Sequence, residues 1–148
     1  MKSCWIVTRG EKTLLEWRHL PVPQPGVGEI TMRVHAAALN RGELLVGGVV
    51  HGGPEKLGGI EAAGEIINVG TGVTQFKIGD KVIGRVRGGF AEYTCAPAHQ
   101  TMPLPRHLSF QQGAAIPISF LTAYETLYPP YGKLKTGEWL LITGASAG

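Results

Sequence analysis

Glycine and proline are spread along the whole chain, and this spread constrains the fold more than any other feature of the sequence. There are 22 glycines and 10 prolines among 148 residues, and they do not recur with a fixed period. Glycine supplies the positive φ angles of tight turns, and proline fixes turn geometry but cannot donate a strand hydrogen bond. The pattern therefore predicts many tight turns between short strands, which is a mainly β domain with a few short helices.

Runs of apolar or alternating residues between these turns predict the strands themselves. A β-hairpin is expected where residues 4–8 and 13–18 flank a short turn that contains Gly10. Every second residue is apolar from 30 to 34, which predicts a strand over 29–36 with one buried face. A further strand is expected over 90–96. Together these segments indicate a β-rich unit that occupies most of the chain.

The pattern changes after about residue 105. Ser109 followed three residues later by Gln112 is a capping-box arrangement, which predicts a helix that runs to about residue 115. A second helix is expected over 119–128, with a shared apolar face made by Phe120, Leu121, Tyr124 and Leu127. Pro117 is expected to end or kink the first helix, and Pro129-Pro130 to close the second.

The last residues carry a signal of their own. Residues 139–143 form a near-continuous apolar run of the kind that is covered on both faces of a parallel sheet, and a glycine-bearing turn follows at 144–148. Dinucleotide-binding domains open in this way, because glycine lets the backbone approach the pyrophosphate. We therefore expect the chain to end at the first strand of a truncated nucleotide-binding domain.

Charge and cysteine content narrow the classes of partner. The net charge is +3, but Lys and Arg are dispersed, without a basic run or an aromatic stacking pattern, so nucleic acid is not expected as a partner. No apolar stretch approaches the roughly 20 residues that cross a bilayer, so insertion into a membrane is not expected either. The only cysteines are Cys4 and Cys95, and nothing resembles a secretory signal, so we expect a cytoplasmic protein.

The order of motifs resembles the N-terminal part of the medium-chain dehydrogenases and reductases, within the quinone oxidoreductase branch that includes zeta-crystallin-like proteins. Each motif is loose alone, but their order and spacing carry the resemblance. The motifs are Val22-Pro23-Gln24-Pro25-Gly26-Val27-Gly28-Glu29, Val34-His35-Ala36-Ala37-Ala38-Leu39-Asn40, Gly59-Ile60-Glu61-Ala62-Ala63-Gly64, Gly79-Asp80-Lys81-Val82, Gly88-Gly89-Phe90-Ala91-Glu92-Tyr93 and Leu121-Thr122-Ala123-Tyr124.

This resemblance implies a domain organisation. Residues 1–120 are expected to form a GroES-like catalytic domain, a partly open β-barrel. Residues 121–148 are expected to supply a linking helix and the first strand and glycine turn of a truncated NAD(P)-binding Rossmann domain. The active site of such proteins would lie in the cleft between the two domains, and the family's usual homodimer contact would be made largely by the missing sheet.

The same resemblance argues against zinc. A catalytic zinc needs about three protein ligands and an open position. In the zinc-dependent relatives a Cys is expected at the place of Asn40 and a His at the place of Ile60, and both are absent here. The cysteine cluster of a structural zinc lobe is also absent, because Cys95 stands alone in its region. We therefore predict that there is no metal site.

The resemblance also assigns site residues, and for some of them a simpler, structural interpretation exists. Asn40 is the expected catalytic residue, a polar group that faces substrate and nicotinamide, although an isolated Asn would more often bond its own loop backbone. Glu43, Leu45 and Glu61 are assigned to the substrate pocket, with Glu61 interpreted as chiefly structural. The expected cofactor-binding residues are Thr122, Gly144, Ala145 and Gly148.

The resulting functional prediction is hydride transfer without zinc from NADPH, with NADH possible, to a quinone or related enone. The 148-residue chain alone is expected to be inactive. An enoyl or alkenal reductase, or an alcohol dehydrogenase relative, remains an alternative on the same scaffold. A non-enzymatic GroES-like binding module remains an alternative of another class.

Overall fold

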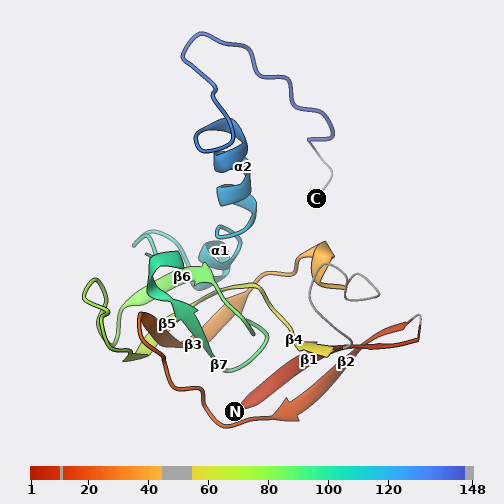
Figure 1. Cartoon of the computed structure of the whole chain (residues 1–148), viewed down its shortest axis with the longest axis vertical. Helices are drawn as coiled ribbons and strands as arrows, with labels where there is room; N and C mark the ends of the chain where they lie inside the picture. Colours follow the sequence, from red (N-terminus) through yellow and green to blue (C-terminus); the bar gives the residue numbers. More distant parts are fainter. Residues whose placement is uncertain (11, 45–54, 146–148) are drawn as a thin grey trace.

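Antiparallel strands form the body of the molecule in the computed structural model, which describes residues 1–10, 12–44 and 55–145 (Figure 1). The strands of this part are β1 (Lys2–Arg9), β2 (Lys12–His19), β3 (Glu29–Ala37), β4 (Glu55–Leu57), β5 (Glu61–Val69), β6 (Lys81–Arg85), β7 (Tyr93–Pro97) and β8 (Thr101–Pro103). Its helical segments are η1 (Arg41–Leu44), η2 (Ala98–Gln100), α1 (Phe110–Ala114) and α2 (Ser119–Leu127). The predicted mainly β fold with short helices is confirmed.

A small sheet contains strands in the order β2-β1-β4. β1 and β2 pair antiparallel along their whole length, and Gly10 in their turn has a φ of 62°, a conformation that glycine adopts without strain. The hairpin predicted over 4–8 and 13–18 is therefore confirmed, with each strand longer by one or two residues at each end. β4 pairs with the other edge of β1.

A second sheet has the order β7-β3-β5-β6-β8 and curls into a half-barrel (Figure 1). All of its neighbouring strands are antiparallel, and two register shifts interrupt the pairing of β3 with β5. Such irregularities increase local twist and bend a strand. Gly64 in β5 allows the close pairing, because a Cβ there would overlap the carbonyl oxygen of Arg33. The predicted partly open β-barrel is confirmed.

One face of this sheet holds the main core, whose buried residues are Ile30, Met32, Ala62, Ile66, Val82, Val86, Ala96 and Ala98. The prediction of one buried face in 29–36 is wrong at Thr31, which is also fully buried. Thr31 Oγ1 donates to the carbonyl oxygen of Pro23 at 3.2 Å. The proline-rich connector therefore covers the other side of β3 here, and the hydroxyl is satisfied in its burial.

The opposite face of the sheet is covered in part by α1. Ala114 of α1 packs with Ala63 and Ile83 in a second buried cluster. The helix begins as predicted, because Ser109 Oγ accepts from Gln112 N at 3.2 Å and Gln112 Oε1 accepts from Ser109 N at 2.9 Å. This capping box is confirmed, and it directs the chain towards α2.

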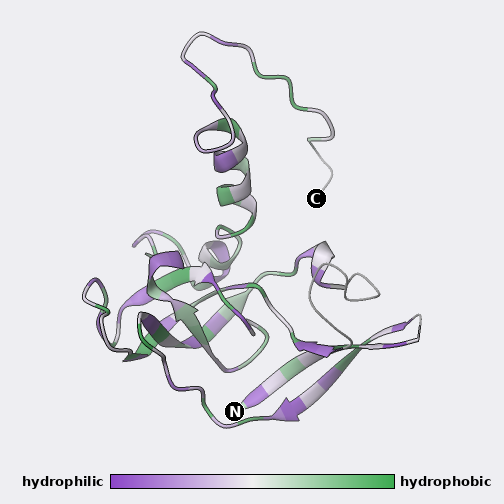
Figure 2. Cartoon of the chain, viewed as in Figure 1, coloured by the Kyte–Doolittle hydropathy of each residue, from purple (hydrophilic) through white to green (hydrophobic). Residues whose placement is uncertain are grey.

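Beyond α1, α2 projects from the body, and residues 128–145 continue from its end as irregular chain (Figure 1). The helix predicted over 119–128 is confirmed, but none of its residues is buried, and Phe120 is 65% exposed. In Figure 2, α2 and the chain that follows it show green hydrophobic residues interspersed with pale and purple ones. None of the helices in the described ranges is long and apolar enough to cross a membrane.

The strand predicted over 139–143 is wrong for this structure, where these described residues are irregular and Trp139 is 99% exposed. A strand needs a neighbour to satisfy its backbone N–H and C=O groups. Within the described ranges no strand pairing involves 139–143. The apolar run therefore lacks the partner that would make it a strand.

Candidate active site

Three of the residues predicted for the site, Asn40, Glu43 and Glu61, lie in one hydrogen-bonded group, here called the Asn40 cluster. Asn40 follows β3 and precedes η1, and its Nδ2 donates to Glu61 Oε1 at 2.8 Å. A carboxylate only accepts, so the amide nitrogen must be the atom that faces Glu61. The Oδ1 atom and the second N–H of Asn40 are therefore directed away from this carboxylate. This hydrogen bond of the Asn40 side chain reaches another strand, whereas an isolated Asn would more often bond the backbone of its own loop.

Glu43 holds the main chain of the same loop. Its Oε2 accepts from Asn40 N at 3.0 Å, and its Oε1 accepts from Gly59 N at 2.8 Å. The side chain is only 1% exposed. Gly59 has a φ of 91°, and a Cβ at this position would overlap the backbone nitrogen of Phe90. Glu43 therefore links the loop after β3 to a turn that only glycine fits.

Glu61 is the first residue of β5 and is also 1% exposed. Its Oε1 accepts from Asn40, and its Oε2 accepts from the backbone N–H of Ile118 at 2.8 Å. Ile118 is the N-cap residue of α2. One buried carboxylate thus joins the loop after β3 to the start of α2. The register of the sheet makes this possible, because Ala37 of β3 pairs with Ala62 of β5.

The electrostatics of the cluster come mainly from N–H donors. No ion pair within 4 Å is formed by Glu43 or Glu61 in the described part of the chain. The Lys56 ammonium in β4 interacts electrostatically with the Glu43 carboxylate without forming an ion pair within 4 Å. Burial lowers the pKa of the Lys56 ammonium, and the Glu43 carboxylate partly offsets that effect. Four backbone and side-chain N–H bonds therefore replace salt bridges in stabilising the two buried carboxylates.

The predicted cofactor residues lie outside this cluster. Thr122 is exposed on α2, and its N–H donates to Ile118 O at 3.0 Å, which places it one helical turn beyond the residue that Glu61 binds. Gly144, with a φ of 64°, and Ala145 are exposed in the irregular segment after α2. Leu45 and Gly148 lie outside the described residues. The roles assigned to all of these positions stay predictions.

Two residues that donate to the carboxylates of this cluster, Ile118 and Gly59, were not predicted from the sequence as part of the site. The backbone N–H of Ile118 carries no side-chain signal, so no sequence pattern could reveal it. Gly59 did have a signal, because a pair of glycines before an apolar strand often marks close backbone approach. That signal indicates tight packing, but it does not reveal that the Gly59 N–H donates to a buried carboxylate.

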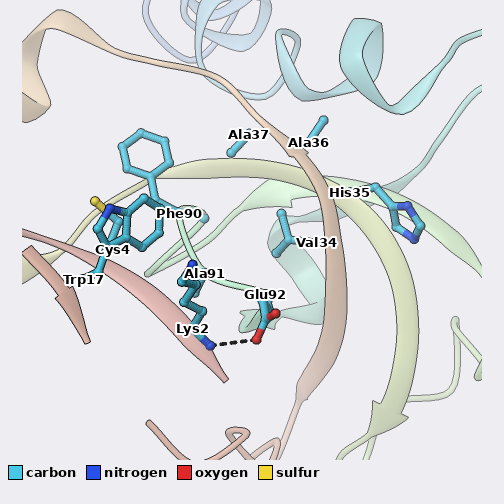
Figure 3. A pocket seen from close by; sticks show the side chains of 11 residues that line it. Lys2, Cys4, Trp17, Val34, His35, Ala36, Ala37, Phe90, Ala91 and Glu92 are labelled. Atoms are coloured by element: carbon cyan, nitrogen blue, oxygen red, sulfur yellow. Dashed lines mark hydrogen bonds between the residues drawn. The ribbon is translucent and has the colours of Figure 1, made fainter. Parts of the chain in front are cut away.

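A separate open pocket of about 460 Å³ lies beside β1, β2 and β3. Figure 3 shows the side chains that line it. Its wall is largely apolar, with Cys4, Val34 and Phe90 among the lining residues, and Lys2 N donates to Glu92 Oε2 at 2.7 Å at its rim. Burial raises the pKa of the Cys4 thiol above its usual value. No member of the Asn40 cluster lines this pocket.

The described residues also bear on metal binding. Among them, no group of three or more His, Cys, Asp or Glu side chains is placed to hold a metal ion. The absence of zinc stays a prediction that rests on Asn40 and Ile60 standing where zinc-dependent relatives are expected to carry ligands.

Comparisons with known proteins agree on one family. The model of the alcohol dehydrogenase GroES-like domain matches residues 26–106. Human quinone oxidoreductase is 37% identical over 154 residues, which covers 100% of this chain and 46% of that protein. The rat synaptic vesicle membrane protein VAT-1 homolog is 33% identical over 142 residues, which covers 93% and 35%. The chain spans 35–47% of the length of the curated relatives.

Solved structures give the same result. A mycobacterial quinone oxidoreductase superposes with a TM-score of 0.80 at 28% identity, covering 93% of this chain and 44% of that one. Escherichia coli quinone oxidoreductase, solved with NADPH, gives 0.77 at 26% identity and covers 88% and 41%. The CurK enoyl reductase gives 0.68 at 26% identity and covers 82% and 41%.

Proposed function

The chain belongs to the alcohol dehydrogenase GroES-like family, in the quinone oxidoreductase branch of the medium-chain dehydrogenases and reductases, and we propose that it forms the substrate side of an NADPH-dependent reductase. The acceptor is a quinone or a related enone, and no zinc takes part. A nucleotide-binding half follows in the complete protein, which acts as a cytoplasmic homodimer. The proposal of a second half is supported by the curated relatives, of whose length this chain spans 35–47%.

The observation that carries the proposal is the fixed orientation of Asn40. Its Nδ2 is held by Glu61 Oε1 at 2.8 Å and its main-chain nitrogen by Glu43 Oε2 at 3.0 Å. The second N–H of the amide is directed elsewhere and is available to donate to a carbonyl oxygen. A preorganised donor of this kind stabilises the charge that develops on that oxygen, and it does so without a metal ion.

The residues present fit the nicotinamide end of the cofactor. Thr122 offers an exposed hydroxyl one helical turn beyond Ile118, which is itself bound to the Asn40 cluster. Gly144, with its φ of 64° and exposed backbone, suits the close approach of a pyrophosphate. When bound, NADPH supplies the hydride. Thr122 would then orient the nicotinamide, and Asn40 would bind the acceptor oxygen.

The proposal is tested by titrating the full-length gene product and this 148-residue chain with NADPH, followed by cofactor fluorescence. NADPH oxidation is then measured with 1,4-benzoquinone. Binding and turnover by the long form only are expected, because most phosphate contacts would come from the nucleotide-binding half. Absence of NADPH binding by both forms would overturn the reductase assignment and favour a non-enzymatic binding module.

A second candidate is an enoyl reductase, favoured by the similarity to the CurK enoyl reductase. Both candidates use the same hydride step, because quinones, enones and enoyl thioesters are all electrophilic alkenes conjugated to a carbonyl group. Comparing kcat/KM for 1,4-benzoquinone with that for a crotonyl thioester separates them. A higher value for the thioester would replace the quinone assignment.

A further inference from the structure

We propose that Glu61 is a positioning residue, whose buried carboxylate couples the orientation of the Asn40 amide to the place of α2. The idea rests on the proposed function, since it concerns how the expected catalytic amide is held. Three segments meet at this carboxylate, and two of them carry residues predicted to contact substrate or cofactor. Glu61 itself acts through Asn40 and touches neither.

Burial is the first step of the argument. Glu61 is 1% exposed, so its carboxylate is closed to a substrate molecule. A buried carboxylate requires hydrogen-bond donors, and both oxygens here have one, Asn40 Nδ2 on Oε1 and Ile118 N on Oε2, each at 2.8 Å. The donors come from positions 21 and 57 residues away in the chain. Holding distant segments together is therefore what this side chain does.

The second step concerns the direction of the Asn40 amide. The oxygen and NH₂ ends of an Asn amide have nearly the same shape, so shape alone does not decide which of them faces a neighbouring group. A carboxylate resolves this choice because it accepts and cannot donate. Glu43 fixes the main chain of Asn40 independently, through the backbone nitrogen. Loss of the Glu61 charge would therefore release the side chain while the loop stays in place.

The third step links the amide to α2. Ile118 is the N-cap residue of this helix and has no side-chain cap of its own, and Glu61 satisfies its N–H from the sheet. No residue of α2 is buried, so this hydrogen bond is a defined attachment of a helix that projects from the body (Figure 1). Thr122 lies one turn further along. A shift of α2 would therefore pull on the carboxylate that orients Asn40.

The test compares Glu61→Gln with Glu65→Gln, a matched removal of charge on the same strand. Glu65 is only partly buried and lies 3.9 Å from Arg33, so its loss leaves the Asn40 cluster intact. The Gln amide at position 61 would turn its NH₂ group towards one of two N–H donors. In the full-length protein, kcat for 1,4-benzoquinone should fall about 10- to 100-fold, with the KM for NADPH nearly unchanged. Glu65→Gln should match the wild type.

A second readout does not depend on turnover. The side-chain NH₂ resonances of Asn40, assigned in a ¹⁵N-labelled sample by their loss in Asn40→Ala, should move in Glu61→Gln and stay in place in Glu65→Gln. If Glu61→Gln does not fold, Glu61→Asp keeps the charge but is one methylene short of spanning both donors. It should move the same resonances and lower kcat.

Failure of this inference differs from failure of the proposed function. If the wild type reduces quinone and Glu61→Gln matches Glu65→Gln in kcat and in the Asn40 resonances, the positioning role is overturned. Additive effects of Asn40→Ala and Glu61→Gln on kcat would also contradict it, because residues acting through one contact are coupled. If the wild type is inactive, only the proposed function fails, and the resonances still decide the positioning role.

Discussion

Replacing Glu43 by Ala should destabilise the chain more than the loss of any exposed carboxylate. The substitution removes two acceptor atoms and leaves the N–H groups of Asn40 and Gly59 without partners. A buried donor left unpaired costs about 1–3 kcal/mol. Gly59 is fully enclosed by the turn before β7, whereas Asn40 is half-buried and can recover a water molecule. The expected loss in the free energy of unfolding is therefore about 2–4 kcal/mol.

The assay for this prediction is urea unfolding of the 148-residue chain, followed by tryptophan fluorescence. Glu92→Ala is the matched control, because Glu92 is exposed and also accepts one backbone N–H, from Lys2 at 2.7 Å. The control should lose no more than about 1 kcal/mol, because the Lys2 N–H can bond to water instead. Equal midpoints for the two variants would refute the view that the burial of Glu43 stabilises the loop.

Three other predictions concern stability. Ser109→Ala removes the capping box and should lower the free energy of unfolding by about 1 kcal/mol in urea. Gly59→Ala should lower the free energy of unfolding clearly more than Gly72→Ala. The two glycines have similar φ angles, 91° and 84°, but only a Cβ at position 59 would overlap backbone atoms. Equal losses of stability would contradict the overlap. The Arg18 guanidinium holds the pKa of the Glu55 carboxyl below its usual value, so this pair stabilises the fold above about pH 4 and the contribution disappears as pH falls further. Arg18→Ala should accordingly flatten the acid limb of the stability curve, and an unchanged limb would show that the pair contributes nothing.

Local signals in the sequence were sufficient for elements held by neighbouring residues. The hairpin at Gly10 and the capping box at Ser109 depend on contacts between residues close in the chain, so spacing alone predicted them. Elements that need distant partners were less predictable. The run 139–143 has strand composition, but no strand among the described residues pairs with it. Thr31 is buried by a connector whose path no periodicity encodes.

The site shows the same division. A family resemblance pointed to Asn40, Glu43 and Glu61, but their contacts depend on the register of β3 against β5, which brings Ala37 opposite Ala62. Alternation of apolar residues predicts one continuous register, so it does not reveal the two register shifts in this pairing. The bond from Ile118 to Glu61 was beyond prediction, because a backbone N–H has no sequence identity.

The central claim is that Asn40 acts on the substrate in an NADPH-dependent reduction, and single-turnover kinetics test it most directly. The full-length gene product, preloaded with NADPH, is mixed with 1,4-benzoquinone, and the rate of cofactor oxidation is compared for Asn40→Ala and for Asn68→Ala, outside the cluster. The account predicts a rate lower by about 100-fold or more for Asn40→Ala, with NADPH affinity unchanged, and a normal rate for Asn68→Ala. A normal rate for Asn40→Ala would contradict the account.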